Sequence, residues 1–455
     1  MSYVSSCAFD TIAVAMQDVS AMACFLTNIF LDRLFMRPLG KITLQMLIKT
    51  EWRFLLFGFF MSFWSSLGQT FFISLFSAEI RADLGLSHGA FGSYYALATT
   101  LSALTLFWLG KLADTISVPR LSVMTVGGVC LAAFHFSFVQ SVMMLIIGIY
   151  FLRLSGQGMM YHVYSTAVTR RYLQVRGRAL AISGFGMNAA EALFPIVVVL
   201  GLGFFDWRLI WIMLPIFAFI SFAPAIPYLT RRTDFQDGPG READTAPGKA
   251  EDKDSPPSIR RTQVIKDSAF WAVIIWLMMV PGFTVTGLFF HQIHIASEKG
   301  IPLFIWSSNY IWYALAAIGG ALLSGILVDR FSAHRSAVAA QVPMVLACIT
   351  LMTSDSLMML AVFFALFGCA GGMGQPLVNA LLAERYGTKW LGEIKALASP
   401  LNVFSSALSP AVMGILFDYG VGLNIVIALL LSLSCFSLFM PLLWFNILGR
   451  TQMSN

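Results

Sequence analysis

The stretch Gly110-Lys-Leu-Ala-Asp114 returns 215 residues later as Gly325-Ile-Leu-Val-Asp329. The same offset, without a gap, pairs further identical residues across about a hundred positions. One identity means little, because Gly and Pro each make up roughly 5–7% of average sequences, but a run of identities in one register indicates a duplication. The chain is therefore two copies of one unit. The further pairs are Ser93 and Ser308, Tyr95 and Tyr310, Gly156 and Gly371, Arg170 and Arg385, Gly177 and Gly392, Ala181 and Ala396, and Pro195 and Pro410.

The composition places the chain in a lipid bilayer. Of its 455 residues, 58% are hydrophobic and only 11% are charged, whereas about 25% of the residues of a soluble domain are charged. A duplicated, apolar chain is first of all a transporter candidate. The six cysteines show no CxxC or metal-ligand spacing. We therefore expect neither a metal site nor a cofactor.

Twelve apolar stretches approach or exceed the roughly 20 residues that a membrane-spanning helix needs. Each is expected to be helical, because a backbone in lipid must satisfy its own hydrogen bonds. The sequence thus predicts an all-α membrane protein with six spans, a polar stretch, and six more spans. The predicted spans are residues 54–80, 88–110, 118–139, 141–168, 177–203, 207–229, 269–296, 304–328, 336–352, 357–383, 392–418 and 421–447.

The domain organisation follows from these spans. We predict a first half at residues 51–230, a cytoplasmic linker at 231–268 and a second half at 269–450. Residues 234–257 are rich in charge, Pro and Gly and contain almost no large apolar residues, which is typical of a flexible linker.

Residues 1–50 are predicted to be an N-terminal extension. Polar residues such as Asp10, Asp18 and Asp32 interrupt the apolar sequence there, so no window of it crosses a membrane cheaply. No basic region precedes the apolar part, as it would in a signal peptide. Two interpretations remain open for residues 1–45, which are a start assigned too far upstream and a loose helix at the membrane interface.

The distribution of Lys and Arg predicts the orientation. If both termini are cytoplasmic, the internal loops and their flanks hold 19 of these residues, and the external loops hold only Arg81, Arg208 and Lys299. The positive-inside rule requires this asymmetry, so we expect a protein of the cell (inner) membrane with both termini in the cytoplasm. The net charge of +6 follows from the same bias, and no nucleic-acid partner is needed to explain it.

Three features of the sequence resemble the major facilitator superfamily. They are the repeated loops Gly110–Asp114 and Gly325–Arg330, the segment Arg153-Leu-Ser-Gly-Gln-Gly158 in span 4, and the segment from Arg171 to Ala181 that leads into span 5. The last one is similar to monocarboxylate-porter-like members. The resemblance covers roughly residues 50–450 and implies the major facilitator fold, with two pseudo-symmetric halves of six helices and secondary transport of a small molecule.

Some positions depart from the family pattern. The loop usually continues with a basic residue after the aspartate, but Thr115 follows Asp114 here. Span 5 also lacks the Gly-Pro-rich element of the family's drug antiporters, because Pro195 lies too far from the glycines of that span. The second departure disfavours drug–proton antiport.

The repeated loop makes physical sense as a gate. A Gly at the membrane surface lets two helices approach closely, and an Asp four residues later accepts hydrogen bonds from a helix N-terminus or pairs with an Arg across the interface. We predict that Gly110, Asp114, Gly325, Asp329 and Arg330 act in gating. The alternative is that both aspartates are solvated loop carboxylates.

Charged residues within the spans are few and therefore informative. Arg153 in span 4 and Glu191 in span 5 lie at about the same depth, roughly 18 Å from the external end at 1.5 Å per residue, so we expect them to be able to meet. One interpretation is a structural ion pair. The other is that Glu191 takes up a proton while Arg153 binds an anionic substrate or tunes that proton.

Four other polar residues are candidates for substrate or proton binding. Gln69, Asn188 and Asn402 are expected near the middle of the membrane, where hydrogen bonding between helices is the alternative use of such side chains. His291, near the end of span 7, is a candidate proton relay, whereas packing is favoured for His294.

The sequence favours a secondary transporter in which two halves alternate around a central site. We expect proton-coupled movement of a small organic anion such as a monocarboxylate. Export of amphipathic compounds and a non-transporting membrane sensor or scaffold remain as alternatives. An enzyme is not expected, because the sequence contains no metal cluster, nucleophile elbow or phosphate loop.

The predicted orientation can be tested at the linker. A single cysteine at position 255, in place of Ser255 and in a cysteine-free background, should resist a membrane-impermeant thiol reagent in intact cells, because the linker is predicted to be cytoplasmic. Labelling from outside would reverse the orientation.

Overall fold

The computed structural model describes residues 44–172, 175–231, 259–353, 356–387 and 389–452. Its secondary structure in these ranges is helical. The first half comprises α2 (Leu44–Trp64), η1 (Ser65–Gly68), α3 (Thr70–Ile73), η2 (Ser74–Phe76), α4 (Ser77–Leu84), α5 (His88–Leu109), α6 (Leu112–Thr115), α7 (Val118–Ser137), α8 (Val142–Leu152), the π-helix η3 (Arg153–Met160), α9 (Tyr161–Arg171), α10 (Arg176–Leu202), α11 (Trp207–Phe222), η4 (Ala223–Ala225) and α12 (Ile226–Leu229).

The second half also contains six spans, but in the described residues its π-helix opens its first span and is not in its fourth. It comprises α13 (Arg261–Val264), the π-helix η6 (Phe270–Ile274), α14 (Ile275–Phe290), α15 (Gln292–Glu298), α16 (Leu303–Ser308), α17 (Tyr310–Phe331), α18 (Ala333–Thr353), α19 (Leu357–Tyr386), α20 (Leu391–Asp418) and α21 (Leu423–Gln452).

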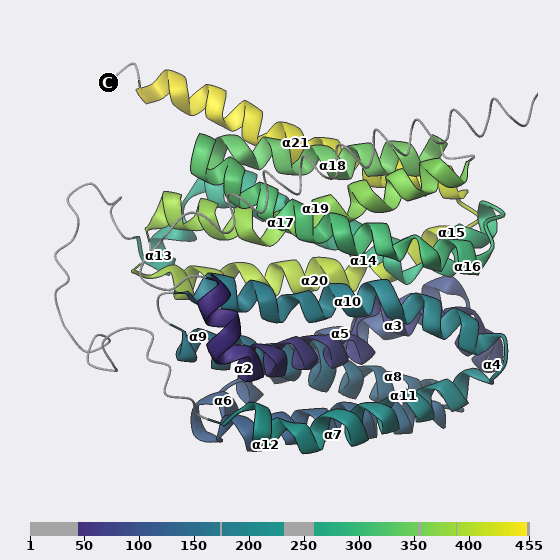
Figure 1. Cartoon of the computed structure of the whole chain (residues 1–455). Coiled ribbons are helices and arrows are strands. Elements are labelled where there is room, and N and C mark those ends of the chain that lie inside the picture. The colour runs from purple at the N-terminus through teal and green to yellow at the C-terminus, as the bar shows by residue number, and fades with distance from the viewer. Residues whose placement is uncertain (1–43, 173–174, 232–258, 354–355, 388, 453–455) are drawn as a thin grey trace, which may run out of the picture.

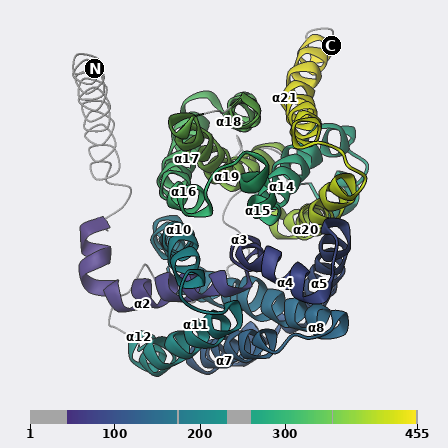
Figure 2. The ribbon, with the colours of Figure 1, turned by 90° about the vertical axis from the view of Figure 1, so that its right-hand side faces the viewer.

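The helices form twelve candidate membrane spans in the described ranges. Eleven are long and apolar enough to cross a bilayer, and the bent pair Leu47–Gly68 and Thr70–Leu84, inclined by 47°, supplies a twelfth. The predicted all-α architecture of twelve spans is confirmed. Figures 1 and 2 show one bundle of purple-to-teal helices and a second of green-to-yellow helices, running side by side along a common direction. Between the bundles, α5 packs along α20 and α10 packs along α17.

The two ends of the bundle differ in charge. We call the end at which α6, α9 and α13 lie the basic end, since the arginine-rich loops emerge there, and the end at which α4 and α15 lie the opposite end (Figure 1). The sequence predicts that the basic end is cytoplasmic.

The predictions for residues 1–43 and for linker residues 232–258 lie outside the described residues. The predicted boundary at residue 50 falls inside α2, in which the side chains of Leu47 and Glu51 are fully buried.

A carboxylate, an arginine and a tyrosine join the first and fourth spans of the first half at the basic end. Glu51 Oε2 accepts hydrogen bonds from Arg171 Nε at 2.6 Å and from the Tyr172 hydroxyl at 2.9 Å. The Glu51 carboxylate is completely buried. A buried charge is tolerated only when it is paired and hydrogen-bonded, as it is here.

The second half repeats this cluster with an aspartate. Asp267 Oδ2 accepts hydrogen bonds from Arg385 Nε and from the Tyr386 hydroxyl, both at 2.8 Å. Burial opposes ionisation of Asp267, but these bonds and one from the Ala269 amide outweigh it and lower the pKa of the carboxyl. A lowered pKa means that the cluster stabilises the fold above about pH 4 and loses this contribution as the pH falls through the lowered value.

The repeated cluster corrects the alignment of the two halves near Arg385. The ungapped offset of 215 paired Arg170 with Arg385, whereas the shared contacts match Arg171 with Arg385, an offset of 214. The repeated Arg-Tyr dipeptide was the signal in the sequence that could have revealed this shift.

The buried cluster generates a stability prediction. Glu51→Gln should lower the melting temperature by several degrees, because breaking a buried ion pair costs about 3–5 kcal/mol. Asp267→Asn should lower it less, since the Asp267 side chain is 21% exposed. Asp329→Asn, at an exposed carboxylate, is the control in a thermal melt of the purified protein. A Glu51→Gln variant with the same melting temperature as this control would contradict the assignment of Glu51 to a stabilising buried ion pair.

Candidate transport site

A cavity of about 450 Å³ lies between the two halves, with residues of both in its wall. Lys395 is the only charged side chain among the described residues that line it. Five amide side chains supply the other strong hydrogen-bonding groups, and two methionines and two valines supply apolar surface. The complete lining is Gln69, Gln157, Tyr161, Met187, Met278, Gln375, Val378, Asn379, Leu382, Lys395, Ala398, Ser399, Asn402 and Val403.

A second cavity of about 270 Å³ adjoins the first and shares Gln157, Gln375 and Asn402 with it. Its other lining is mostly apolar and includes Val285 and Tyr313. The joined space extends to the basic end, because Lys395 lies in the second turn of α20, which begins there. A larger hollow of about 710 Å³ lies among the loops of the second half at the opposite end, and it is not between the halves.

Hydrogen bonds close the opposite end around Gln292, whose side chain is fully buried. Its Nε2 donates to the Phe71 carbonyl at 2.9 Å and to Ser74 Oγ at 2.7 Å, both in the first half. Its Oε1 accepts from the Tyr310 hydroxyl at 2.6 Å. Ser74 Oγ in turn donates to the Phe289 carbonyl at 2.7 Å. The network therefore joins the broken first span to the seventh and eighth spans.

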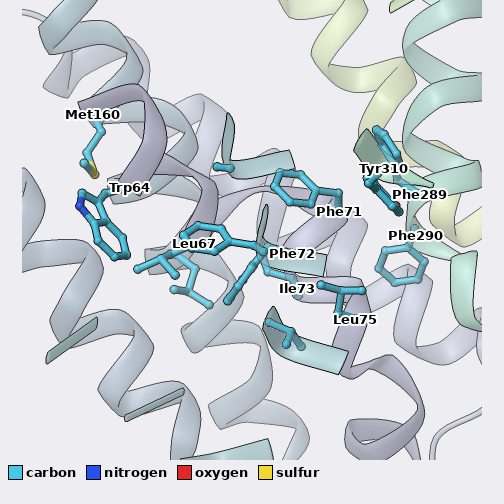
Figure 3. Packing of buried hydrophobic residues seen from close by; sticks show 14 of the residues in the cluster. Trp64, Leu67, Phe71, Phe72, Ile73, Leu75, Met160, Phe289, Phe290 and Tyr310 are labelled. Carbon is cyan, nitrogen blue, oxygen red and sulfur yellow. The ribbon is translucent and has the colours of Figure 1, made fainter. Parts of the chain in front are cut away.

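Aromatic rings reinforce this closure. The Phe71 ring lies 6.3 Å from the rings of both Phe289 and Tyr310, and Figure 3 shows it facing them from the other half. Phe91 and Phe290 also meet across the halves, at 5.0 Å. These contacts separate the cavity from the opposite end.

A second closure joins α5 to α20. Asp418, the last residue of α20, accepts hydrogen bonds from Ser87 Oγ at 2.6 Å, the His88 amide at 3.0 Å and the Gly89 amide at 2.8 Å. The first amides of a helix have no partner within the helix and carry partial positive charge, so a carboxylate at this place is doubly favoured. Asp418 thus caps α5 from the other half.

Glycines let these two helices touch through their backbones. A Cβ at Gly92 would strike the Pro410 carbonyl, and one at Gly414 would strike the His88 carbonyl. Small residues at such crossings permit close packing in membranes.

Arg153 is buried at a break in the first span. Gln69 has an extended backbone there, with φ −89° and ψ 153°, which leaves carbonyls at the end of η1 without helical partners. Arg153 Nη1 donates to the Gly68 carbonyl at 3.1 Å and lies 3.4 Å from Thr70 Oγ1. The guanidinium carbon also lies 5.4 Å from the ring centre of Tyr95. Non-helical backbone at membrane depth persists only when it is satisfied in this way.

Glu191 lies elsewhere, on α10. Asn188 Nδ2 donates to its Oε2 at 3.3 Å, and the carboxylate is within electrostatic range of the hydroxyls of Tyr310 and Tyr313 on α17. Within the described residues Arg153 and Glu191 do not form an ion pair, so the expected contact between them is wrong for this conformation. Equal depth did not bring them together, because Arg153 points to the break in the first span.

The other predicted residues lie in three places, namely the cavity, the α10 helix beside Glu191, and the opposite end. Gln69 and Asn402 line the cavity, whereas Asn188 bonds Glu191. His291 lies at the opposite end, where its Nε2 is 3.0 Å from the Pro410 carbonyl. Sequence reasoning missed four cavity residues as site candidates. They are Gln157, Gln375, Asn379 and Lys395.

The predicted gating residues lie at the basic end. Asp114 pairs with Arg170 of its own half, and His162 Nε2 is 3.0 Å from the Gly110 carbonyl. Asp329 is exposed at the end of α17, and the Arg330 guanidinium lies over the Phe331 ring. In this conformation, the described contacts of Asp114 do not cross the interface, so the gate role stays a prediction.

A family model decides the broader assignment. The Major Facilitator Superfamily model matches residues 58–410 and 282–452. This chain belongs to the major facilitator superfamily. As a member it is a secondary transporter and not an enzyme. The narrower similarity to monocarboxylate-porter-like members stays a prediction.

Solved structures agree with the major facilitator fold. Two crystal structures of a bacterial homologue of the human lysosomal transporter Spinster, both inward-facing, match with TM-scores of 0.63. The unoccupied form is 13% identical and the match covers 87% of this chain and 96% of that one; for the occupied form the values are 14%, 86% and 95%. At this identity the likeness shows the fold alone. No curated protein matches the sequence.

The separation of Arg153 from Glu191 can be tested by combining substitutions. Arg153→Met should lower the melting temperature because the Gly68 carbonyl loses its partner, and Glu191→Gln should have a separate effect. Since the two side chains are not in contact, the shifts should add in the double variant. Recovery of stability in the double variant would show that the residues pair after all.

Proposed function

We propose that this chain moves a small organic anion, such as a monocarboxylate, together with protons, by alternating access between its two halves. The observation that carries the proposal is the central cavity with Lys395 as its single charge. A charge within a membrane span is costly and usually serves a function. Among the described residues the salt bridges do not include Lys395, so its ammonium is free to bind an anion.

The rest of the cavity suits such a substrate. A carboxylate bound to Lys395 gains charge-assisted hydrogen bonds, and the amides of Gln157, Gln375 and Asn379 lie around the same cavity. Met187 and Met278 offer adaptable apolar contact for an organic substituent. The substrate we infer is therefore an anion at one end and apolar at the other.

Glu191 is the proposed proton carrier. Its only described hydrogen bond comes from Asn188, an amide and not a cation. A carboxyl group in an apolar setting without a cation is more stable protonated, and contact with water restores the charge. Because Glu191 lies on α10, which packs along α17 of the other half, rocking of the halves would change its access to water.

The conformation fits one stage of such a cycle. The opposite end is closed by Gln292 and Asp418, and the cavity reaches the basic end. If the basic end is cytoplasmic, this is the inward-facing state. We propose that Gly110, Asp114, Gly325, Asp329 and Arg330 make new contacts between the halves when the basic end closes.

Export of amphipathic compounds is the second candidate. It is favoured by the apolar lining of the adjoining cavity, which includes Leu277, Pro281 and Ala370. Lys395 distinguishes the two candidates, because a neutral or cationic compound does not need it.

Uptake into proteoliposomes tests the proposal. A panel of small acids, amino acids, sugars and cationic drugs would be offered with an imposed pH gradient. Lys395→Met should raise the KM for an acid about tenfold to hundredfold, because a hydrogen bond to a charged group is worth about 1.5–3 kcal/mol. Lys266→Met, at an exposed lysine of the basic end, is the control.

A second variant tests the proposed role of Glu191 as the proton carrier. Glu191→Gln should abolish accumulation against a gradient while exchange of labelled for unlabelled substrate persists. Full accumulation in this variant would remove Glu191 from the coupling mechanism. Unchanged acid transport in Lys395→Met would contradict the anion site.

A further inference from the structure

Three histidines from both halves meet at the opposite end, outside the transport cavity. His88 begins α5 in the first half, whereas in the second half His291 lies at the junction of α14 and α15 and His294 lies in α15. The ring centres of His88 and His294 are 4.3 Å apart, and those of His88 and His291 are 6.0 Å apart. The contact between His88 and His294 exists only while the two halves touch.

The cluster is partly shielded from bulk water, since His291 is buried and both His88 and His294 are half-buried. Ser77, Arg81, Phe91 and Phe290 enclose with the histidines a space of only about 10 Å³, about the size of one water molecule. The Phe417 ring covers the group from α20, with its centre 4.4 Å from that of His294.

The charged groups around the cluster come from three elements. Arg81 of α4 faces all three rings, Asp418 of α20 lies near His88, and Glu298 of α15 lies near His294. Asp418 already accepts three hydrogen bonds from the start of α5, one of them from the His88 amide. The backbone amide of His88 therefore takes part in the closure, and the imidazole of the same residue belongs to the histidine cluster.

Protonation acts differently on the closed and open forms. In the closed form a positive charge on His88 or His294 would be half-buried, 4.3 Å from another imidazole and near Arg81, and both partial burial and like charge disfavour it. Separation of the halves would expose the rings fully to water and would move His294 away from both His88 and Arg81, which weakens both penalties. A proton that binds the open form better must shift the population towards that form.

We propose that His88 and His294 form a proton-binding site whose protonation releases the contact between α5 and α20, so that acid opens the transporter at the opposite end. His291 keeps its hydrogen bond to the Pro410 carbonyl and packs against the site. The inference rests on the alternating-access part of the proposed function and not on the anion or on Glu191. An imidazole that titrates freely only in the open form changes the open fraction about tenfold between pH 7.5 and 5.5.

Thiol labelling of the purified protein in detergent tests the switch without any substrate. Ser77 is 7% exposed and lines the small space between the histidines, so Ser77→Cys in a cysteine-free background reports opening. Its labelling rate at each pH is divided by that of Phe204→Cys, an 82% exposed position, which cancels the pH dependence of thiol reactivity. The ratio should rise about tenfold from pH 7.5 to 5.5.

Variants identify the responsible group. His88→Gln combined with His294→Gln should abolish the rise, and His294→Gln alone should reduce it, provided that thermal melts show folded protein. His135→Gln, at an external histidine whose Nε2 is 3.2 Å from the Met144 carbonyl, should leave the rise intact. A pH-independent ratio in the protein with its native histidines, or a rise that survives the double replacement, would overturn the proposal. Loss of the rise in Glu191→Gln would assign the proton to Glu191, which overturns the switch and leaves the proposed function standing.

Discussion

The contact between α5 and α20 at the opposite end determines the state of the whole molecule. Gly92 and Gly414 place the two backbones against each other, and Asp418 supplies hydrogen bonds to the free amides of α5. Neither half can tilt at this end without giving up both contacts. While they hold, the cavity between the halves can reach only the basic end. The same contact brings His88 against His294.

The break in the first span is held against the fourth span within the first half. Arg153 satisfies the Gly68 carbonyl, and Gly156 lets the fourth span approach that point, since a Cβ there would lie 2.9 Å from the Gly68 Cα. Three residues of the segment Arg153–Gln157 thus have different roles. Arg153 stabilises the break, Gly156 allows the approach, and Gln157 lines the cavity. Two residues after the break, Phe71 reaches the other half.

The sequence predicted the architecture well, because hydropathy and duplication are properties of whole segments. Twelve spans in two halves follow from the apolar stretches and from the repeat of Gly110–Asp114. Gln69 and Asn402, which were expected near the middle of the membrane, line the cavity, and their role in binding substrate stays a prediction. What depth cannot supply is the direction in which a side chain leaves its helix. For this reason, the expected meeting of Arg153 with Glu191 was wrong.

Residues whose role depends on packing between the halves were missed for the same reason. Lys395 was counted only as one of the basic residues that predict orientation, yet it projects into the central cavity. His88 opens a span and carries no sequence signal, and its partners lie about 200 residues away. Asp418 follows no motif, although it caps a helix of the other half.

The central claim is that closure at one end and opening at the other are two sides of one movement. Spin-label distances test it directly, with one pair at positions 204 and 419 of the opposite end and another at positions 115 and 335 of the basic end, all exposed. Gly92→Val should prevent closure, and Gly184→Val, at a glycine with open space around it, is the control. The account predicts that Gly92→Val lengthens the first distance and shortens the second, while the control changes neither. A first distance that lengthens with no change in the second would contradict it.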